Sequence, residues 1–261
     1  MKGNYKEVEA KKYLGQHFLK DENVCKSIAN TVDDFESVSK VVEVGPGMGA
    51  ITKYLIKKEH PFSVIEVDGE SITYLRENYP ELDVVDFNFL KLDLGTLNDN
   101  NPFSLIGNFP YFISAQILTK IFDNRSLVSD VVGMFQKEVV EKVMAKPGKK
   151  NYGIISVLLQ AFYDMEYLFT VDPKSFDPPP NVQSGVIKMT RNSVIELPIE
   201  IGTFKQVVKL GFNQRRKTLR NSLKSILPDE IRDEEIFSKR PEQLEVQEFI
   251  EIGIMIEKHR D

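Results

Sequence analysis

Three glycines in one short stretch are the first residues with a spacing suited to chemistry. They lie in Glu43–Gly49 (EVGPGMG), directly after the apolar run Val41–Val44 and before a helical pattern. Glycine permits a tight turn and lets backbone N–H groups approach a ligand closely. Alone the turn is a weak signal, because nicotinamide enzymes use a similar one. The G-x-G-x-G spacing, with an acid two residues before Gly45, favours S-adenosylmethionine, cradled by Gly45 and Gly47.

A second signal is the acidic residue Glu66, which ends the next apolar run in VIEVD. It follows Gly45 by about 20 residues, the distance at which a carboxylate accepts hydrogen bonds from both ribose hydroxyls of a bound cofactor. The alternative interpretation is a solvated carboxylate at a strand end, which the preceding glycine turn makes less attractive. Together the two motifs identify an adenosine-bearing cofactor and no more.

The reaction is indicated by the block Asn108–Tyr111 (NFPY), which follows another predicted strand. The exocyclic amine of adenine is a poor nucleophile, because its lone pair is delocalised into the ring. The Asn108 amide oxygen and the Pro110 carbonyl could accept its two N–H groups and aim the lone pair at a methyl group. Tyr111 offers a face on which a flipped-out base can stack. The alternative is an ordinary Asn-x-Pro turn.

The elements that position these residues follow from hydrophobic periodicity. Between Lys40 and Met189, β-branched runs alternate with amphipathic stretches, as in a doubly wound α/β domain. The expected strands are Val41–Val44, Phe62–Val67, Asp83–Val85, Ser104–Gly107, Asp130–Phe135, Tyr167–Thr170 and Val186–Met189. The expected helices are Ala50–Lys58, Ser71–Asn78, Ile113–Phe122, Glu138–Ala145 and Gly153–Phe162.

The last two expected strands are joined by a Pro-rich loop without a helix, which indicates an antiparallel edge pair. This trait is more typical of methyltransferases than of nicotinamide-binding domains. We therefore predict an α/β fold with a Rossmann-like class I methyltransferase domain over residues 1–191, built on a seven-stranded sheet whose last strand is antiparallel. Residues 192–261 show a linker followed by helical periodicity, which predicts a small C-terminal α-helical domain.

The C-terminal region also carries the densest positive cluster, although the chain has a net charge of -5. Net charge averages over the surface, whereas phosphate binding needs only a local basic patch. The alternative is a solvated helix face, but repulsion at this density is easier to explain if phosphates neutralise it. We expect RNA binding by this cluster, which Lys11, Lys12, Lys149 and Lys150 could extend. Its central residues are Arg215, Arg216, Lys217 and Arg220, followed by Lys224.

Composition excludes several other classes of protein. The chain has one cysteine, so it cannot hold an internal disulfide framework, and its three histidines are scattered, which argues against a metal site. No apolar run approaches the roughly 20 residues of a membrane span, and the N-terminus lacks a signal-peptide apolar region. We expect a cytoplasmic protein that acts as a monomer without metal or membrane.

Six blocks, in order, resemble the family of ribosomal RNA small-subunit adenine N6,N6-dimethyltransferases (KsgA/RsmA) over essentially the whole chain. The resemblance implies S-adenosylmethionine-dependent dimethylation of two adjacent adenosines near the 3′ end of 16S rRNA, with the immature small ribosomal subunit as partner. The blocks are Lys12–Leu19, Glu43–Gly49, Ile65–Asp68, Asn108–Tyr111, Phe176–Ser184 and Phe212–Asn221.

The resemblance also assigns roles to residues that carry no signal of their own. His17 and Leu19 would line the methionine end of the cofactor, where Asn108 also lies. Asn88 would face the cofactor adenine, at a position where the family usually has aspartate. His17 likewise replaces a more usual asparagine.

Three other functions are compatible with parts of the sequence. A 23S rRNA adenine methyltransferase of the macrolide-resistance type shares the Asn108–Tyr111 block, but such enzymes tend to be strongly basic. A nicotinamide dehydrogenase would explain the glycine turn and Glu66 and leave Asn108–Tyr111 without a purpose. An RNA-binding assembly factor would not need the intact Asn108–Tyr111 block, although binding could accompany catalysis.

Overall fold

The computed structural model describes residues 8–35 and 39–259, which divide into two compact units. The first unit spans Met1–Val140 and Met165–Thr190, and the second spans Glu141–Asp164 and Arg191–Asp261. The segment Glu141–Asp164, which precedes the boundary expected at residue 191, therefore groups with the C-terminal segment. Our assignment of residues 1–191 and 192–261 to two functional domains stays a prediction.

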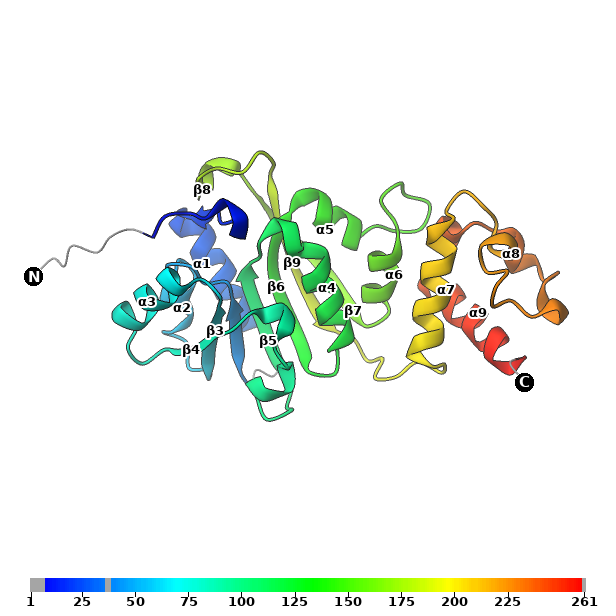
Figure 1. Ribbon diagram of the computed structural model, residues 1–261, viewed down its shortest axis with the longest axis horizontal. Helices are drawn as coiled ribbons and strands as arrows, with labels where there is room; N and C mark the ends of the chain where they lie inside the picture. The colour runs from blue at the N-terminus through cyan, green and yellow to red at the C-terminus, as the bar shows by residue number, and fades with distance from the viewer. Residues whose placement is uncertain (1–7, 36–38, 260–261) are drawn as a thin grey trace, which may run out of the picture. The chain divides into compact units, whose positions relative to one another are not determined.

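A seven-stranded sheet has the order β4-β3-β2-β5-β6-β9-β7 (Figure 1). Strands β4, β3, β2, β5 and β6 pair in parallel, and β9 pairs antiparallel with β6. The predicted antiparallel last strand is thus confirmed, and it lies between β6 and the edge strand β7. The strands are β2 (Val41–Val44), β3 (Phe62–Glu66), β4 (Asp83–Asp86), β5 (Phe103–Asn108), β6 (Val128–Gln136), β7 (Tyr163–Val171) and β9 (Ser184–Arg191).

Each stretch in which the sequence predicted a helix contains or overlaps an α-helix, including Gly153–Phe162, which holds α6. The α-helices are α1 (Glu22–Asn30), α2 (Thr52–Leu55), α3 (Gly69–Asn78), α4 (Ser114–Asp123), α5 (Lys137–Val143), α6 (Ile154–Gln160), α7 (Ile201–Asn213), α8 (Leu219–Ser222) and α9 (Val246–Lys258). Short 3-10 helices are η1 (Lys12–Leu14), η2 (Thr31–Asp34), η3 (Phe89–Lys91), η4 (Leu94–Leu97), η5 (Tyr111–Ile113), η6 (Pro173–Ser175), η7 (Asp229–Ile231), η8 (Glu235–Ser238) and η9 (Pro241–Gln243).

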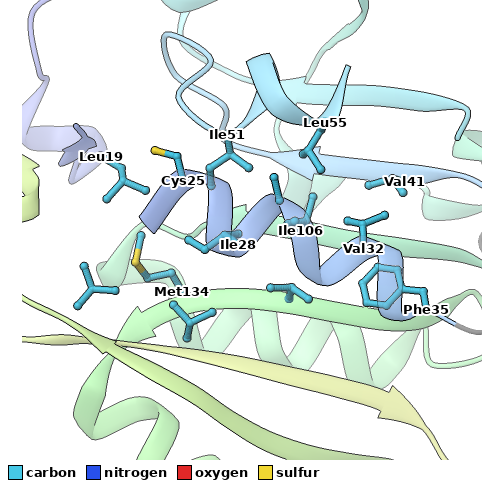
Figure 2. Packing of buried hydrophobic residues seen from close by; sticks show 14 of the residues in the cluster. Leu19, Cys25, Ile28, Val32, Phe35, Val41, Ile51, Leu55, Ile106 and Met134 are labelled. Carbon is cyan, nitrogen blue, oxygen red and sulfur yellow. The ribbon is translucent and has the colours of Figure 1, made fainter. Parts of the chain in front are cut away.

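Helix α1 supplies part of the core that supports the glycine turn. The Asp21 side chain caps this helix by accepting from two backbone N–H groups. Cys25 and Ile28 are fully buried on one face of α1 and belong to the same hydrophobic cluster as Ile51 and Leu55, and Figure 2 shows Cys25 beside Ile51. Burial raises the pKa of the Cys25 thiol to about 12, so Cys25 behaves as an inert core residue.

Two short strands bring distant segments of the first unit together. Strand β1 (Phe18–Leu19) pairs antiparallel with β8 (Phe176–Asp177). The N-terminal segment is also held by Lys11, which forms an ion pair with Asp68. As a result, two of the sequence blocks, Lys12–Leu19 and Phe176–Ser184, lie side by side.

The second unit has its own aromatic core. The ring of Phe212 in α7 stacks on Phe249 in α9, with centroids 5.8 Å apart, and Tyr152 meets Phe212 edge-on. The Tyr152 hydroxyl donates to the Leu244 carbonyl at 2.9 Å. These contacts join Glu141–Asp164 to the C-terminal helices.

Candidate active site

A cavity of about 780 Å³ opens in the first unit where the parallel strands end. Its volume lies in the range typical of small-molecule sites, roughly 300–1,000 Å³. Its lining draws on the ends of β2, β3 and β5 and on the N-terminal segment. The sequence-predicted cofactor and catalytic residues all line it, namely His17, Leu19, Gly45, Gly47, Glu66, Asn88, Asn108, Pro110 and Tyr111.

The glycine turn has the left-handed backbone that its residues permit. Gly45 and Gly47 have φ angles of 69° and 54°, a region that residues with a side chain rarely adopt. A Cβ atom at Gly47 would also lie 2.9 Å from the ring of Phe18. Both conformation and space therefore require glycine at position 47.

Glu66, at the end of β3, stabilises the glycine turn by accepting hydrogen bonds from backbone N–H groups. Its Oε2 accepts from the Gly47 N–H at 3.0 Å, and its Oε1 accepts from the N–H groups of Val67 and Asp68 at 2.7 and 3.0 Å. Burial raises the pKa of this carboxyl, and the three N–H bonds oppose the rise. A carboxylate has about four acceptor sites. Three are used here, so Oε2 keeps one for a ligand hydroxyl.

Glu43, the acid two residues before Gly45, lines the cavity, and the sequence assigned its side chain no role beyond the motif. It is 1% exposed, and its Oε2 accepts from the Thr52 hydroxyl at 2.6 Å. Burial, with a smaller effect of the nearby Glu66 charge, raises the pKa of Glu43 to about 8 against the opposing Thr52 bond. The signal was a carboxylate in the middle of an otherwise apolar strand, Val41–Val44, which marks a buried acid with a specific partner.

Asn88 lines the cavity and caps the 3-10 helix that follows it. Its Oδ1 accepts from the Leu90 N–H at 2.9 Å and so caps the 3-10 helix η3. An amide oxygen has two lone pairs, so Oδ1 can still accept from a second donor. Contact with the cofactor adenine stays a prediction.

We expect Asn88→Ala to weaken S-adenosylmethionine binding by about 0.5–1.5 kcal/mol, because one neutral hydrogen bond is lost. Asn88→Asp should bind as well or better, since its bond to the adenine amine would be charge-assisted, unless nearby Asp86 and Asp93 make another charge costly. The matched control is Asn88→Ser, which keeps a capping oxygen on a shorter side chain. Calorimetric titration should show that it binds as weakly as Asn88→Ala. Wild-type affinity in both variants would mean that Asn88 only caps the helix.

The side chain of Asn108 is oriented by the N-terminal segment. Its Nδ2 donates to the His17 carbonyl at 3.0 Å. Its Oδ1 receives no hydrogen bond from the residues that the structure describes, and Asn108 lines the cavity. Because the bond uses the main chain of His17, it does not depend on which side chain stands at position 17. This explains how histidine can replace the expected asparagine.

The neighbouring Phe109 anchors the block in the core. Its ring is 1% exposed and stacks on Phe135 with centroids 4.9 Å apart. Its N–H donates to the Met134 carbonyl at 3.1 Å. Because Phe109 is buried between them in sequence, Asn108 and Pro110 are positioned at the cavity wall.

Tyr111 is held on two sides. Its hydroxyl shares a 2.5 Å hydrogen bond with the Ser184 hydroxyl, and its ring stacks on His17 with centroids 5.6 Å apart. His17 is fixed in turn by a 2.7 Å hydrogen bond between Nδ1 and the Pro178 carbonyl. Burial raises the pKa of Tyr111. One face of Tyr111 is therefore already covered, and stacking with a substrate base stays a prediction.

The predicted RNA-binding cations lie in the second unit and differ in their contacts. The Arg215 guanidinium donates to the carbonyls of Lys150 and Lys149 at 2.5 and 3.0 Å, and it lies 3.7 Å from Glu242. Arg220 pairs with Asp233 at 3.5 Å. Exposed Arg216 and Lys217 form no ion pair within residues 8–35 and 39–259. Arg215 thus fixes a lysine-bearing loop, while Arg216 and Lys217 are available to phosphates.

Two further findings concern metals and membranes. In the described part of the chain, no group of His, Cys, Asp and Glu side chains is arranged to hold a metal ion. Among the helices that the structure describes, none is both long and apolar enough to span a bilayer.

Comparison with known proteins places this geometry in a family. The family described as ribosomal RNA adenine dimethylase matches residues 7–252. The ribosomal RNA small subunit methyltransferase A of Bacteroides fragilis is 53% identical over 255 residues, covering 96% of this chain and 93% of the relative. The protein of the same name from Flavobacterium johnsoniae is 52% identical, covering 96% and 97%.

Solved structures share the fold. A dimethyladenosine transferase from Plasmodium falciparum superimposes with a TM-score of 0.77 at 23% identity, covering 93% of this chain and 98% of that one. The 23S rRNA methyltransferase ErmE gives a TM-score of 0.66 at 23% identity, covering 90% and 98%. At this identity the likeness shows the class I methyltransferase fold alone. The family match and the relatives, which span nearly the whole chain, show that this chain belongs to the ribosomal RNA adenine dimethylase family.

Proposed function

We propose that this protein transfers methyl groups from S-adenosylmethionine to N6 of two adjacent adenosines near the 3′ end of 16S rRNA, within the immature small ribosomal subunit. The main support for the proposal is the geometry of Asn108. Its Nδ2 donates a hydrogen bond to the His17 carbonyl, which leaves its Oδ1 as an acceptor at the cavity. An acceptor at this point suits an amine donor. The names of the relatives at 50–53% identity point to the same substrate class.

The chain's residues fit the cofactor. Gly45 leaves room for close approach to the backbone, and Glu66 keeps one acceptor site for a ribose hydroxyl. When bound, S-adenosylmethionine supplies a methyl group on a positively charged sulfur. Leu19 and the backbone of His17 would line its methionine end, and Asn88 its adenine.

The protein's contribution to the reaction is to orient the target amine. The Asn108 Oδ1 and the Pro110 carbonyl accept its two N–H groups, which draws the lone pair out of conjugation and points it along one direction. After one methylation a single N–H group remains, and one of the two acceptors can still hold it. The same arrangement therefore serves both transfers to one adenosine.

RNA contact is assigned to the second unit, which consists of the helical region predicted over residues 192–261 together with the segment Glu141–Asp164. Arg215 holds the backbone of Lys149 and Lys150. Exposed Arg216 and Lys217 follow Arg215 directly in sequence. Arg215 thus brings the chain segment of Lys149 and Lys150 next to its own, and exposed cations on these two segments suit RNA phosphates.

Neutralising Arg216 and Lys217 to glutamine should weaken binding to small-subunit particles and flatten its dependence on salt. Each lost phosphate contact should reduce the log–log slope by about 0.7 to 0.9. The slope is obtained from binding titrations at several salt concentrations. The control is Lys57→Gln with Lys258→Gln, which removes the same charge from exposed positions elsewhere. Equal slopes for the two double variants would mean that Arg216 and Lys217 are solvent-exposed residues that do not contact RNA phosphates.

The experiment that tests the function compares substrates. Purified protein and labelled S-adenosylmethionine are incubated with immature small subunits or with large-subunit precursors. The proposal expects label in small-subunit RNA. Label in large-subunit RNA would support the macrolide-resistance type of activity, and binding without label would support an assembly factor. We also propose that the protein acts as a monomer in the cytoplasm, which sedimentation and cell fractionation would test.

A further inference from the structure

A large aromatic side chain stands in solvent at the rim of the active-site cavity. Phe112 is 63% exposed and lies in η5, one residue after the Asn108–Tyr111 block. It lines the same cavity as Asn108 and Pro110. Single exposed apolar residues are common on protein surfaces, so exposure alone assigns no role. Its position beside Asn108 and Pro110 and its packing against Gly15 are the observations that indicate a role.

The ring of Phe112 rests on a glycine of the N-terminal segment. A Cβ atom at Gly15 would lie 2.7 Å from Phe112 Cδ1, and Gly15 has a φ angle of 60°. The segment that carries Gly15 is fixed by the Lys11–Asp68 ion pair and by Gln16, whose Nε2 lies 3.4 Å from Asp68 Oδ2. Phe112 is therefore supported along one edge, while much of its surface stays open.

Tyr111, the residue before it, is engaged differently. Its ring is stacked on His17 and its hydroxyl is bonded to Ser184. Phe112 has no aromatic partner among the described residues. Of these two consecutive rings, Phe112 is the more exposed one, and no ring of the described residues covers it.

We propose that Phe112 is a stacking platform for the nucleobase next to the target adenine in the RNA substrate. The inference rests on the function proposed above. Placing an adenine amine against Asn108 requires that the base leaves its stack, and its neighbour then loses a stacking partner as well. An aromatic ring at the rim replaces that partner. Stacking on aromatic side chains contributes substantially to the binding of single-stranded RNA and tolerates different bases.

The test compares Phe112→Ala, Phe112→Leu and Phe112→Trp in methyl transfer to immature small subunits. Leucine keeps apolar bulk over Gly15 without an aromatic face, and tryptophan restores a face. Alanine and leucine should both lower kcat/KM for the particle by about 5- to 150-fold, mainly through KM, while tryptophan stays near wild type. The affinity for S-adenosylmethionine, measured by calorimetry, should be unchanged in all three.

The control Ile195→Ala removes an apolar side chain that is 81% exposed and does not line the cavity, and it should behave as wild type. Full activity of Phe112→Leu would overturn the proposal, because packing alone would then suffice. Failure of Phe112→Trp to exceed Phe112→Leu would overturn it as well. If the wild-type protein methylates no small-subunit RNA, the proposed function fails instead, so the two failures are distinguishable.

Discussion

Replacing Asn108 with alanine is expected to lower the rate of methyl transfer by about two to three orders of magnitude, while S-adenosylmethionine affinity stays within a few fold. The reason is that Asn108 Oδ1 acts on the target amine, so its contribution belongs to the transition state. Single-turnover transfer to immature small subunits measures the rate, and calorimetry measures the affinity.

The Asn108→Ala variant also loses the bond from Nδ2 to the His17 carbonyl, so folding has to be checked separately. Its melting temperature and its cofactor affinity serve as internal controls for the cavity wall. A slow variant that still binds cofactor places Asn108 in the chemical step. Near-normal methylation would remove Asn108 from the mechanism.

Replacing Glu66 with glutamine is expected to weaken S-adenosylmethionine binding by about one to two orders of magnitude. Three backbone N–H groups donate to the two oxygens of Glu66. A glutamine amide has one oxygen, so either orientation places an NH₂ group against an N–H donor. The glycine turn loses a stabilising hydrogen bond, and the ribose loses its bond to a charged acceptor. A hydrogen bond to a charged group contributes about 1.5–3 kcal/mol.

Calorimetric titration of the demethylated cofactor into Glu66→Gln measures this loss. The control is Glu77→Gln, which removes the same charge from an exposed position on α3 and should bind as wild type. Wild-type affinity in Glu66→Gln would show that this carboxylate neither braces the turn nor holds the ribose.

Much of the fold could be predicted because its signals are local. Strand β2 has the predicted bounds Val41–Val44, because a buried parallel strand appears as a run of mostly apolar, β-branched residues, here interrupted only by Glu43. Helix α1 was not predicted, although Asp21 and the spacing of Cys25, Ile28 and Val32 carried the signal. Strands β1 and β8 have two residues each, which is too short for any periodicity.

The candidate site could be predicted as a set of residues but not as a network. The motifs named Glu66 and Asn108, whereas the bonds from Gly47 to Glu66 and from Asn108 to the His17 carbonyl depend on tertiary structure. The same holds for Arg215, which sequence presents as one of several equivalent cations. Its bonds to the Lys149 and Lys150 carbonyls arise from residues about 65 positions away.

Nucleoside analysis of the RNA product shows directly whether this protein dimethylates adenine. Immature small subunits are treated with wild-type protein or Asn108→Ala and S-adenosylmethionine, and their RNA is digested and separated by mass. The wild-type protein should yield N6,N6-dimethyladenosine, and Asn108→Ala should yield almost none. Methylation of another base or another atom would mean that adenine N6 is not the target, and an equal yield from both proteins would mean that Asn108 does not act on it.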